Sequence, residues 1–133
     1  MPTLPWMSPS EAPSSATAFV MASRLEVRSL RHVPRFLWKS YAAWQQLRSA
    51  PGAFGGSLEA QLTKGVFYTL SAWQDRDALY AYARAEPHKS IMTGLRPTMR
   101  DSVFTYWEVP AQELPISWTD AKQRLEQQAS AAH

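Results

Sequence analysis

Residues 64–79 of the 133-residue chain are KGVFYTLSAWQDRDAL, and this stretch decides the fold. Its first two residues have the composition of a tight turn, and the run 66–73 that follows is rich in the β-branched and aromatic residues that favour strands. Large apolar side chains occur at both odd and even positions of this run, so both faces of the predicted strand must be buried. A carboxylate at Asp75 or Asp77 then begins a helix.

Upstream of this stretch, the pattern predicts a strand, a helix and a second strand. Residues 18–30 are dominated by apolar residues and form the first strand. The helix has Pro34 in its first turn and ends before Pro51, which it cannot include. In residues 55–63 apolar and polar residues alternate, which is typical of a half-buried strand. The tight turn joins this strand to 66–73 as a hairpin.

Downstream, Pro87 breaks or kinks the second helix, and a further turn or two carries apolar residues at helical spacing. Residues 102–109 form the fourth strand. Either Ser117 or Thr119 caps a final helix, whose inner side carries Ala121, Lys122 and Leu125.

The resulting order, β-α-β-β-α-β with a C-terminal helix, predicts a ferredoxin-like α+β fold. Helices in that fold cover one face of the sheet, yet the strands 66–73 and 102–109 carry bulky apolar groups on both faces. Monomers seldom expose such a surface. We therefore predict a homodimer paired through the sheet face, a dimeric α+β barrel. A different partner, or a monomer with a lipid-like ligand, remains an alternative.

The composition predicts one domain with two short flanking segments. Residues 1–17 are rich in Pro and Ser and are expected to form a flexible arm. The α+β domain spans 18–128, and 129–133 form a disordered tail.

Charge and composition exclude several classes of function. The net charge of +3 is spread along the chain without the basic cluster that nucleic-acid binding requires. No apolar run approaches the ~20 residues of a membrane span, and the N-terminal segment lacks the positive region of a signal peptide. The chain has no cysteine, and its potential metal ligands lack useful spacing. A cytoplasmic protein without a metal site is the expectation.

One part of the chain resembles a known superfamily. The segment 69–79, TLSAWQDRDAL, followed by Glu-Pro-His at 86–88, is similar to the third strand and second helix of antibiotic biosynthesis monooxygenase-like dimeric α+β barrels. In those proteins a strand often ends in Trp, an acidic or Ser residue starts the helix, and a Pro-His follows.

The C-terminal part extends this resemblance. Leu-Pro at 114–115, Trp118 and the run 121–125 resemble a branch of the superfamily reminiscent of spheroidene monooxygenase-like proteins. The likeness covers about residues 18–125, and its motifs specify the fold more than the chemistry.

The resemblance implies a cavity between the sheet and the helices that holds an apolar or aromatic small molecule. Some members of the superfamily oxidise such a molecule with dioxygen and no cofactor, and this is the leading expectation for the chain. A non-catalytic ligand-binding or sensor protein is the alternative. Haem is a minor alternative, because the position of the haem-ligating His in related barrels falls near Met92, with His88 one turn earlier.

His88 is the residue most suited to proton transfer, because it lies on the apolar face of the second helical region and an imidazole exchanges protons near neutral pH. A structural His, bonded to a backbone carbonyl or holding the kink at Pro87, is the competing interpretation. Aromatic and sulfur-containing side chains are predicted to wall the pocket, and the candidate substrate-binding residues are Tyr82, Trp73, Met92, Trp44 and Tyr106.

Overall fold

The computed structural model describes residues 6, 16–85, 88–114 and 116–132. Its centre is a four-stranded antiparallel sheet with the strand order β2-β3-β1-β4. The strands are β1 (Thr17–Val27), β2 (Ala53–Gln61), β3 (Val66–Trp73) and β4 (Met99–Pro110). The α-helices are α1 (Val33–Gln46), α2 (Arg76–Arg84), α3 (His88–Leu95) and α4 (Trp118–Ala132). Short 3-10 helices occur at Leu30–His32, Leu47–Ser49, Arg96–Thr98 and Ala111–Glu113. The chain therefore has the predicted ferredoxin-like α+β fold with an added C-terminal helix.

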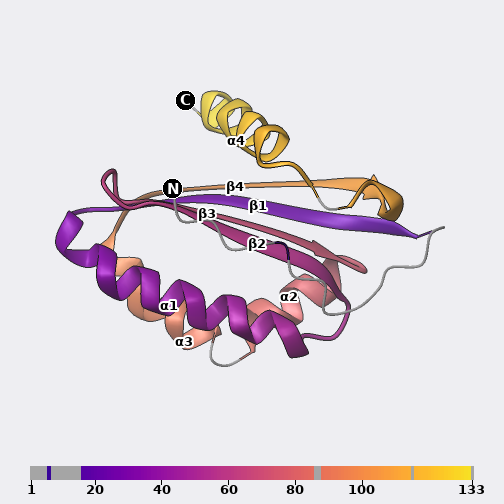
Figure 1. The fold of residues 1–133 in the computed structure, drawn as a ribbon, viewed down its shortest axis with the longest axis horizontal. Coiled ribbons are helices and arrows are strands. Elements are labelled where there is room, and N and C mark those ends of the chain that lie inside the picture. The colour runs from indigo at the N-terminus through magenta and orange to yellow at the C-terminus, as the bar shows by residue number, and fades with distance from the viewer. Residues whose placement is uncertain (1–5, 7–15, 86–87, 115, 133) are drawn as a thin grey trace.

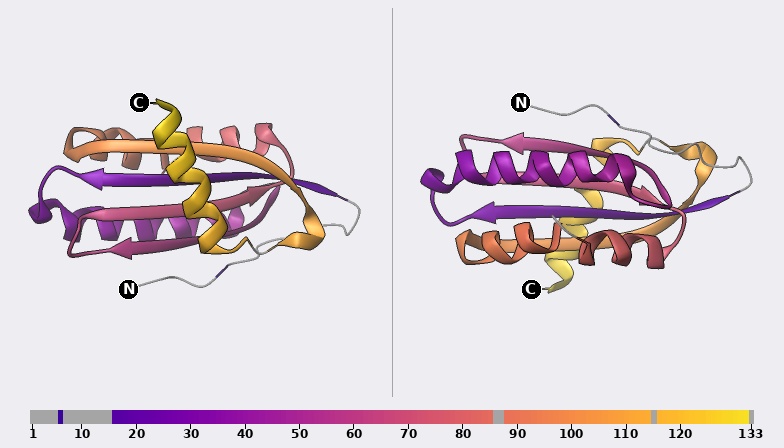
Figure 2. Two further views of the ribbon diagram at one scale, coloured as in Figure 1. Left: turned by 90° about the horizontal axis from the view of Figure 1, so that it is seen from above. Right: turned by 90° about the horizontal axis from the view of Figure 1, so that it is seen from below.

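The elements form three layers. Helices α1, α2 and α3 lie against one face of the sheet, and α4 lies against the other (Figure 1). Seen from above and below the sheet, α1 follows the β2–β3 side, α2 and α3 follow the β4 side, and α4 crosses the strands (Figure 2).

Local side-chain chemistry sets the element boundaries. Of the two acidic candidates, Asp75 caps α2, since its Oδ1 accepts a hydrogen bond from the Ala78 backbone N–H at 2.8 Å. Ser117 Oγ accepts from the Asp120 N–H at 3.1 Å and so begins α4. Gly65 has φ +66° in the β2–β3 turn, a conformation that favours glycine.

The face of the sheet toward α1–α3 packs a continuous apolar core. Phe67 of β3 contacts Phe36 of α1 with ring centroids 4.5 Å apart. Ile91 and Leu95 of α3 complete this cluster. Trp73, at the end of β3, is fully buried in a neighbouring cluster. This core fixes α1 and α3 against the sheet.

The opposite face is covered by α4. Leu70 of β3 is buried together with Ala121 and Leu125 of α4. Two further contacts join α4 to the outer strands of the sheet. Lys122 forms an ion pair with Glu59 of β2, and the Arg124 guanidinium carbon lies 4.5 Å from the centroid of the Trp107 ring of β4.

This arrangement corrects the burial argument for a dimer. The sequence indicated that a second subunit must cover this face, but the chain's own α4 covers its apolar part. Beside α4 the same face forms a groove with the charged residues Arg24, Glu26 and Lys64 in its walls. Burial of apolar surface thus does not require a partner here.

The predicted flanking segments are only partly described. Within the predicted arm 1–17, Trp6 packs against the α4-side core and lies directly over Gly55, where any side chain would collide with the indole. Most of that arm lies outside the described residues. Helix α4 runs to Ala132, into the predicted tail 129–133. No helix in the described part of the chain is long and apolar enough to cross a membrane.

Leu125→Ala tests the contribution of α4 to the fold. Leu125 is 2% exposed, so the truncation should lower the free energy of unfolding by about 2–5 kcal/mol. Urea denaturation followed by circular dichroism measures this change. The control Gln127→Ala, at an exposed position of the same helix, should stay within about 0.5 kcal/mol of the wild type. Equal stabilities of the two variants would contradict the docking of α4.

Candidate functional site

A small inner cavity lies between the sheet and the helices α1–α3. Its volume is about 80 Å³. Its walls combine apolar side chains with a few polar ones, which come from α1, α2, α3 and the facing strands; they include Trp44, Tyr82, His88, Met92, Thr69 and Ser71.

Two hydrogen bonds hold His88 at the start of α3. Its backbone N–H donates to Gln46 Oε1 at 2.8 Å, and its Nδ1 lies 3.2 Å from the carbonyl oxygen of Ala83. A carbonyl oxygen only accepts hydrogen bonds, so Nδ1 carries the proton of the neutral ring and Nε2 carries the lone pair. Nε2 is therefore the nitrogen able to accept a proton.

Burial keeps this imidazole uncharged. Desolvation lowers the pKa of His88 below its ordinary value, and the hydrogen bond to Ala83 opposes this effect only in part. At neutral pH the side chain is consequently a neutral base rather than a cation.

Tyr82 supports the His88 ring. Its ring centroid lies 4.8 Å from that of His88 and 5.0 Å from that of Trp73. Its hydroxyl donates to the Ala43 carbonyl of α1, and burial raises the pKa of Tyr82, so the phenol stays protonated. Tyr82 thus links α1, α2 and α3 around His88.

Four of the six predicted site residues meet at the inner cavity: Trp44, Tyr82, His88 and Met92. Trp73 lies behind Tyr82, and its Nε1 donates to Ser71 Oγ at 2.8 Å. Tyr106 lies on the edge strand β4, where it is 48% exposed and stacks on Phe19 at 5.8 Å. Neither Trp73 nor Tyr106 lines the cavity.

The sequence reasoning missed Gln46, which connects α1 to both elements of the site. Its Oε1 accepts from the His88 N–H, and its Nε2 donates to the Tyr82 carbonyl at 3.4 Å. A polar residue at the end of an amphipathic helix gives no signal of such a bridge, because both partners are about 40 residues away in sequence.

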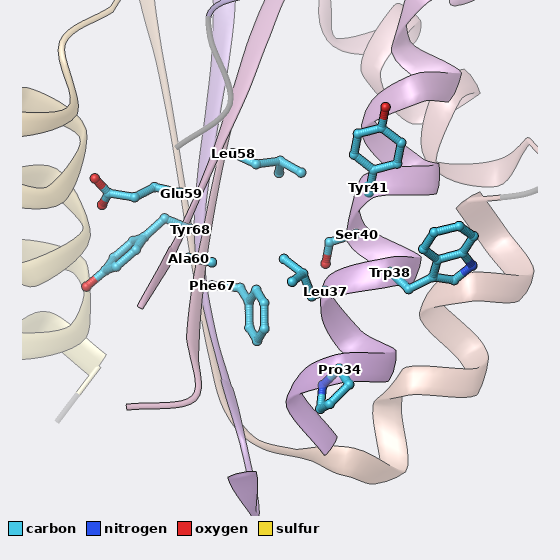
Figure 3. A pocket seen from close by; sticks show the side chains of 10 residues that line it. All are labelled: Pro34, Leu37, Trp38, Ser40, Tyr41, Leu58, Glu59, Ala60, Phe67 and Tyr68. Carbon is cyan, nitrogen blue, oxygen red and sulfur yellow. The ribbon is translucent and has the colours of Figure 1, made fainter. Parts of the chain in front are cut away.

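A larger outer cleft opens beside the inner cavity, at the edge of the sheet formed by β2. Its volume is about 500 Å³. In Figure 3, Leu37 and Ser40 on α1 face Leu58 and Phe67 on the strands across the open space, whereas Trp38 points away from the strands. None of the six predicted site residues lines this cleft.

The inner cavity does not fit a haem group, because about 80 Å³ is far less than a porphyrin occupies. His88 and Met92 both line it, as the haem alternative requires, but the space between the helices and the sheet is filled by the core. The described residues contain no group of three His, Cys, Asp or Glu side chains placed to hold a metal ion.

The fold is similar to that of antibiotic biosynthesis monooxygenase-like α+β proteins. A putative antibiotic biosynthesis monooxygenase from Nitrosomonas europaea matches with a TM-score of 0.64 at 12% identity, over 75% of this chain and 94% of that one. SnoaB, a cofactor-independent oxygenase from Streptomyces nogalater, matches with a TM-score of 0.58 at 17% identity, over 74% and 98%. A putative antibiotic biosynthesis monooxygenase from Caulobacter crescentus gives 0.61 at 18% identity, over 71% and 91%. At these identities the likeness establishes the fold alone.

The chain belongs to the family described as a domain of unknown function, DUF3291, whose model matches residues 6–131. Comparison with curated proteins gives no match.

The lowered pKa of His88 predicts a pH-dependent stability. Because the unfolded state binds a proton at His88 before the folded state does, the free energy of unfolding should fall as the pH drops below about 6.5. The variant His88→Gln has no imidazole, so the decrease in the free energy of unfolding that is due to His88 should be absent. Urea denaturation of both proteins between pH 7.5 and 5.0 measures the difference, and parallel curves would show that His88 titrates alike in both states.

Proposed function

We propose that the protein is a small-molecule oxygenase that acts on an apolar or aromatic metabolite without a bound cofactor, with His88 as the general base. The observation that carries the proposal is the neutral, buried imidazole, whose Nε2 is the proton acceptor and whose ring lies in a cavity wall. The fold shared with a cofactor-independent oxygenase supports it.

The proposed reaction begins with a proton transfer. Nε2 of His88 removes the acidic proton of an activated substrate, such as the methylene group of an anthrone, and leaves an electron-rich anion. The anion reduces dioxygen and forms a C–O bond. The O–O bond then breaks, so that one oxygen atom becomes a carbonyl of the product and the other leaves as water. One anthrone and one dioxygen give one anthraquinone and one water.

The apolar surroundings favour this chemistry in two ways. Ile91, Leu95 and Phe36 close the core around the inner cavity and limit the access of water, which would otherwise protonate the anion. The protonated phenol of Tyr82, bonded to Ala43, keeps the imidazole in place without competing as a base.

A ligand-binding or sensor protein without turnover is the second candidate. It is favoured by the bonds of His88 to Ala83 and Gln46, which also serve to hold α3 against α2 and α1. In this case the cavity binds a ligand and His88 has a structural role.

His88→Gln distinguishes the two candidates. Removal of the base should lower the rate of oxygen consumption with anthrone by about 10²–10⁴-fold, while anthraquinone binds within about tenfold of the wild type. An oxygen electrode and fluorescence titration measure these two quantities. The control His32→Gln, at the start of α1 and away from the cavity, should keep the wild-type rate. No consumption of oxygen by the wild type, across a panel of anthrones and quinols, would contradict the oxygenase.

We further propose that the protein is a cytoplasmic homodimer. Because α4 covers the apolar part of the sheet face, pairing through that face would have to use the outer surface of α4 and the charged groove beside it.

Light scattering of the purified protein tests the dimer. The expected mass is twice the 15.0 kDa of one chain. A monomeric mass at all protein concentrations would contradict the pairing.

A further inference from the structure

The inner cavity is too small for the substrate that the proposed function requires. Sites for organic ligands usually measure about 300–1,000 Å³, whereas the cavity beside His88 has about 80 Å³. A fused-ring aromatic molecule therefore reaches His88 only with one edge, and its remaining rings need another place. The outer cleft, with about 500 Å³, has the required size.

The two spaces share a wall. Ser40 of α1 and Leu58 of β2 line both the inner cavity and the outer cleft. Both side chains are half-buried, and they come from opposite sides of the opening, since α1 faces the sheet across the cleft (Figure 3). The two spaces are thus adjacent, and Ser40 and Leu58 are the residues that line both.

The two spaces differ in chemistry. The outer cleft is walled chiefly by apolar groups, among them Leu37, Tyr41 and Phe67. The inner cavity has the His88 imidazole and the hydroxyls of Thr69 and Ser71 in its walls. This difference matches a molecule with an apolar body and one polar, acidic edge.

Trp44 carries a buried hydrogen-bond donor beside the inner cavity. The ring lines the inner cavity, and its Nε1–H is buried and finds no acceptor among the described residues. A buried donor without a partner costs about 1–3 kcal/mol, and a carbonyl oxygen at the substrate's edge would supply the acceptor.

The exposed surface of α1 also favours an occupant of the outer cleft. Of the seven large hydrophobic residues exposed in the described part of the chain, three line this cleft: Leu37 (38% exposed), Trp38 (71%) and Tyr41 (43%). Leu37 faces the open space, whereas the Trp38 ring points away from the strands (Figure 3). A cluster of exposed apolar residues around one opening is typical of a binding site.

We propose that the outer cleft binds the apolar body of a fused-ring aromatic substrate, and that Leu58 and Ser40 form a threshold that admits only the substrate's acidic, carbonyl-bearing edge to His88 and Trp44. This inference rests on the proposed function for the identity of the reacting edge. The binding of the aromatic body in the outer cleft is independent of whether a reaction follows.

Leu37→Glu tests the outer cleft. A carboxylate in the apolar wall should weaken the binding of anthraquinone, measured by quenching of tryptophan fluorescence, by at least about tenfold. The matched control Leu30→Glu makes the same change at a residue that is 56% exposed and lines neither space, and it should bind like the wild type. Wild-type protein that binds no anthraquinone, or equal affinities of the two variants, would overturn the proposal.

Leu58→Trp tests the threshold. The larger side chain should lower kcat for anthrone oxidation by about 100-fold, while anthraquinone affinity falls by no more than about tenfold. The control Leu30→Trp, at an exposed residue that lines neither space, should keep the turnover. Thermal unfolding of each variant checks that it is folded.

The outcomes separate this inference from the proposed function. If the wild type consumes oxygen and Leu37→Glu and Leu58→Trp do so at the same rate, the cleft and threshold are wrong and the oxygenase stands. If neither the wild type nor any variant consumes oxygen, but Leu37→Glu alone loses anthraquinone binding, the oxygenase proposal is wrong and the cleft is the binding site.

Discussion

The architecture depends on the burial of the two central strands on both of their faces. In β1 and β3, residues of one parity, such as Leu25 and Phe67, pack under α1 and α3, and residues of the other parity, such as Val20 and Leu70, pack under α4. A strand with apolar groups on both faces needs a layer on each side. The helices within the β-α-β-β-α-β order supply one layer, because they connect strands on the same face (Figure 1). The second layer is α4, so the C-terminal helix is part of the domain core rather than an appendage.

The order of the elements follows from local sequence patterns, but the coverage of the second face does not. Alternation in β2, the Lys-Gly turn before β3 and the acidic start of α2 are local signals, and they predicted a ferredoxin-like fold that the structure confirms. The pattern of Ala121 and Leu125 also indicated the inner side of a final helix. An amphipathic pattern shows that one face of a helix is buried, but it does not show which surface buries that face. The apolar surface of the strands was therefore assigned to a second subunit, although α4 of the same chain meets it.

The candidate site likewise contains residues that local sequence patterns predict and residues that they do not. His88, Met92, Tyr82 and Trp44 were predicted because they lie on apolar helix faces that turn toward a sheet, and they meet at one cavity. Trp73 and Tyr106 lie on strands. For a strand, alternation in the sequence shows which residues share a face of the sheet, but not which helix packs against that face. Gln46, Ser40 and Leu58 were missed for a different reason. Their roles arise from the register of α1 against β2 and α2, which is a long-range property that no local pattern encodes.

The small size of the inner cavity and the state of His88 are linked. Desolvation by burial lowers the pKa of His88, and Phe36, Ile91 and Leu95 fill much of the space between the helices and the sheet beside the same cavity. A cavity large enough for a whole aromatic molecule would require smaller residues at these positions. Water would then enter the empty site, and the pKa of His88 would return toward its ordinary value. A single core therefore cannot both keep His88 buried and neutral and contain a pocket large enough for a whole aromatic molecule. Dividing the site between a tight inner cavity and an open cleft at the β2 edge satisfies both, since the base stays dry while the larger part of a ligand lies outside the core.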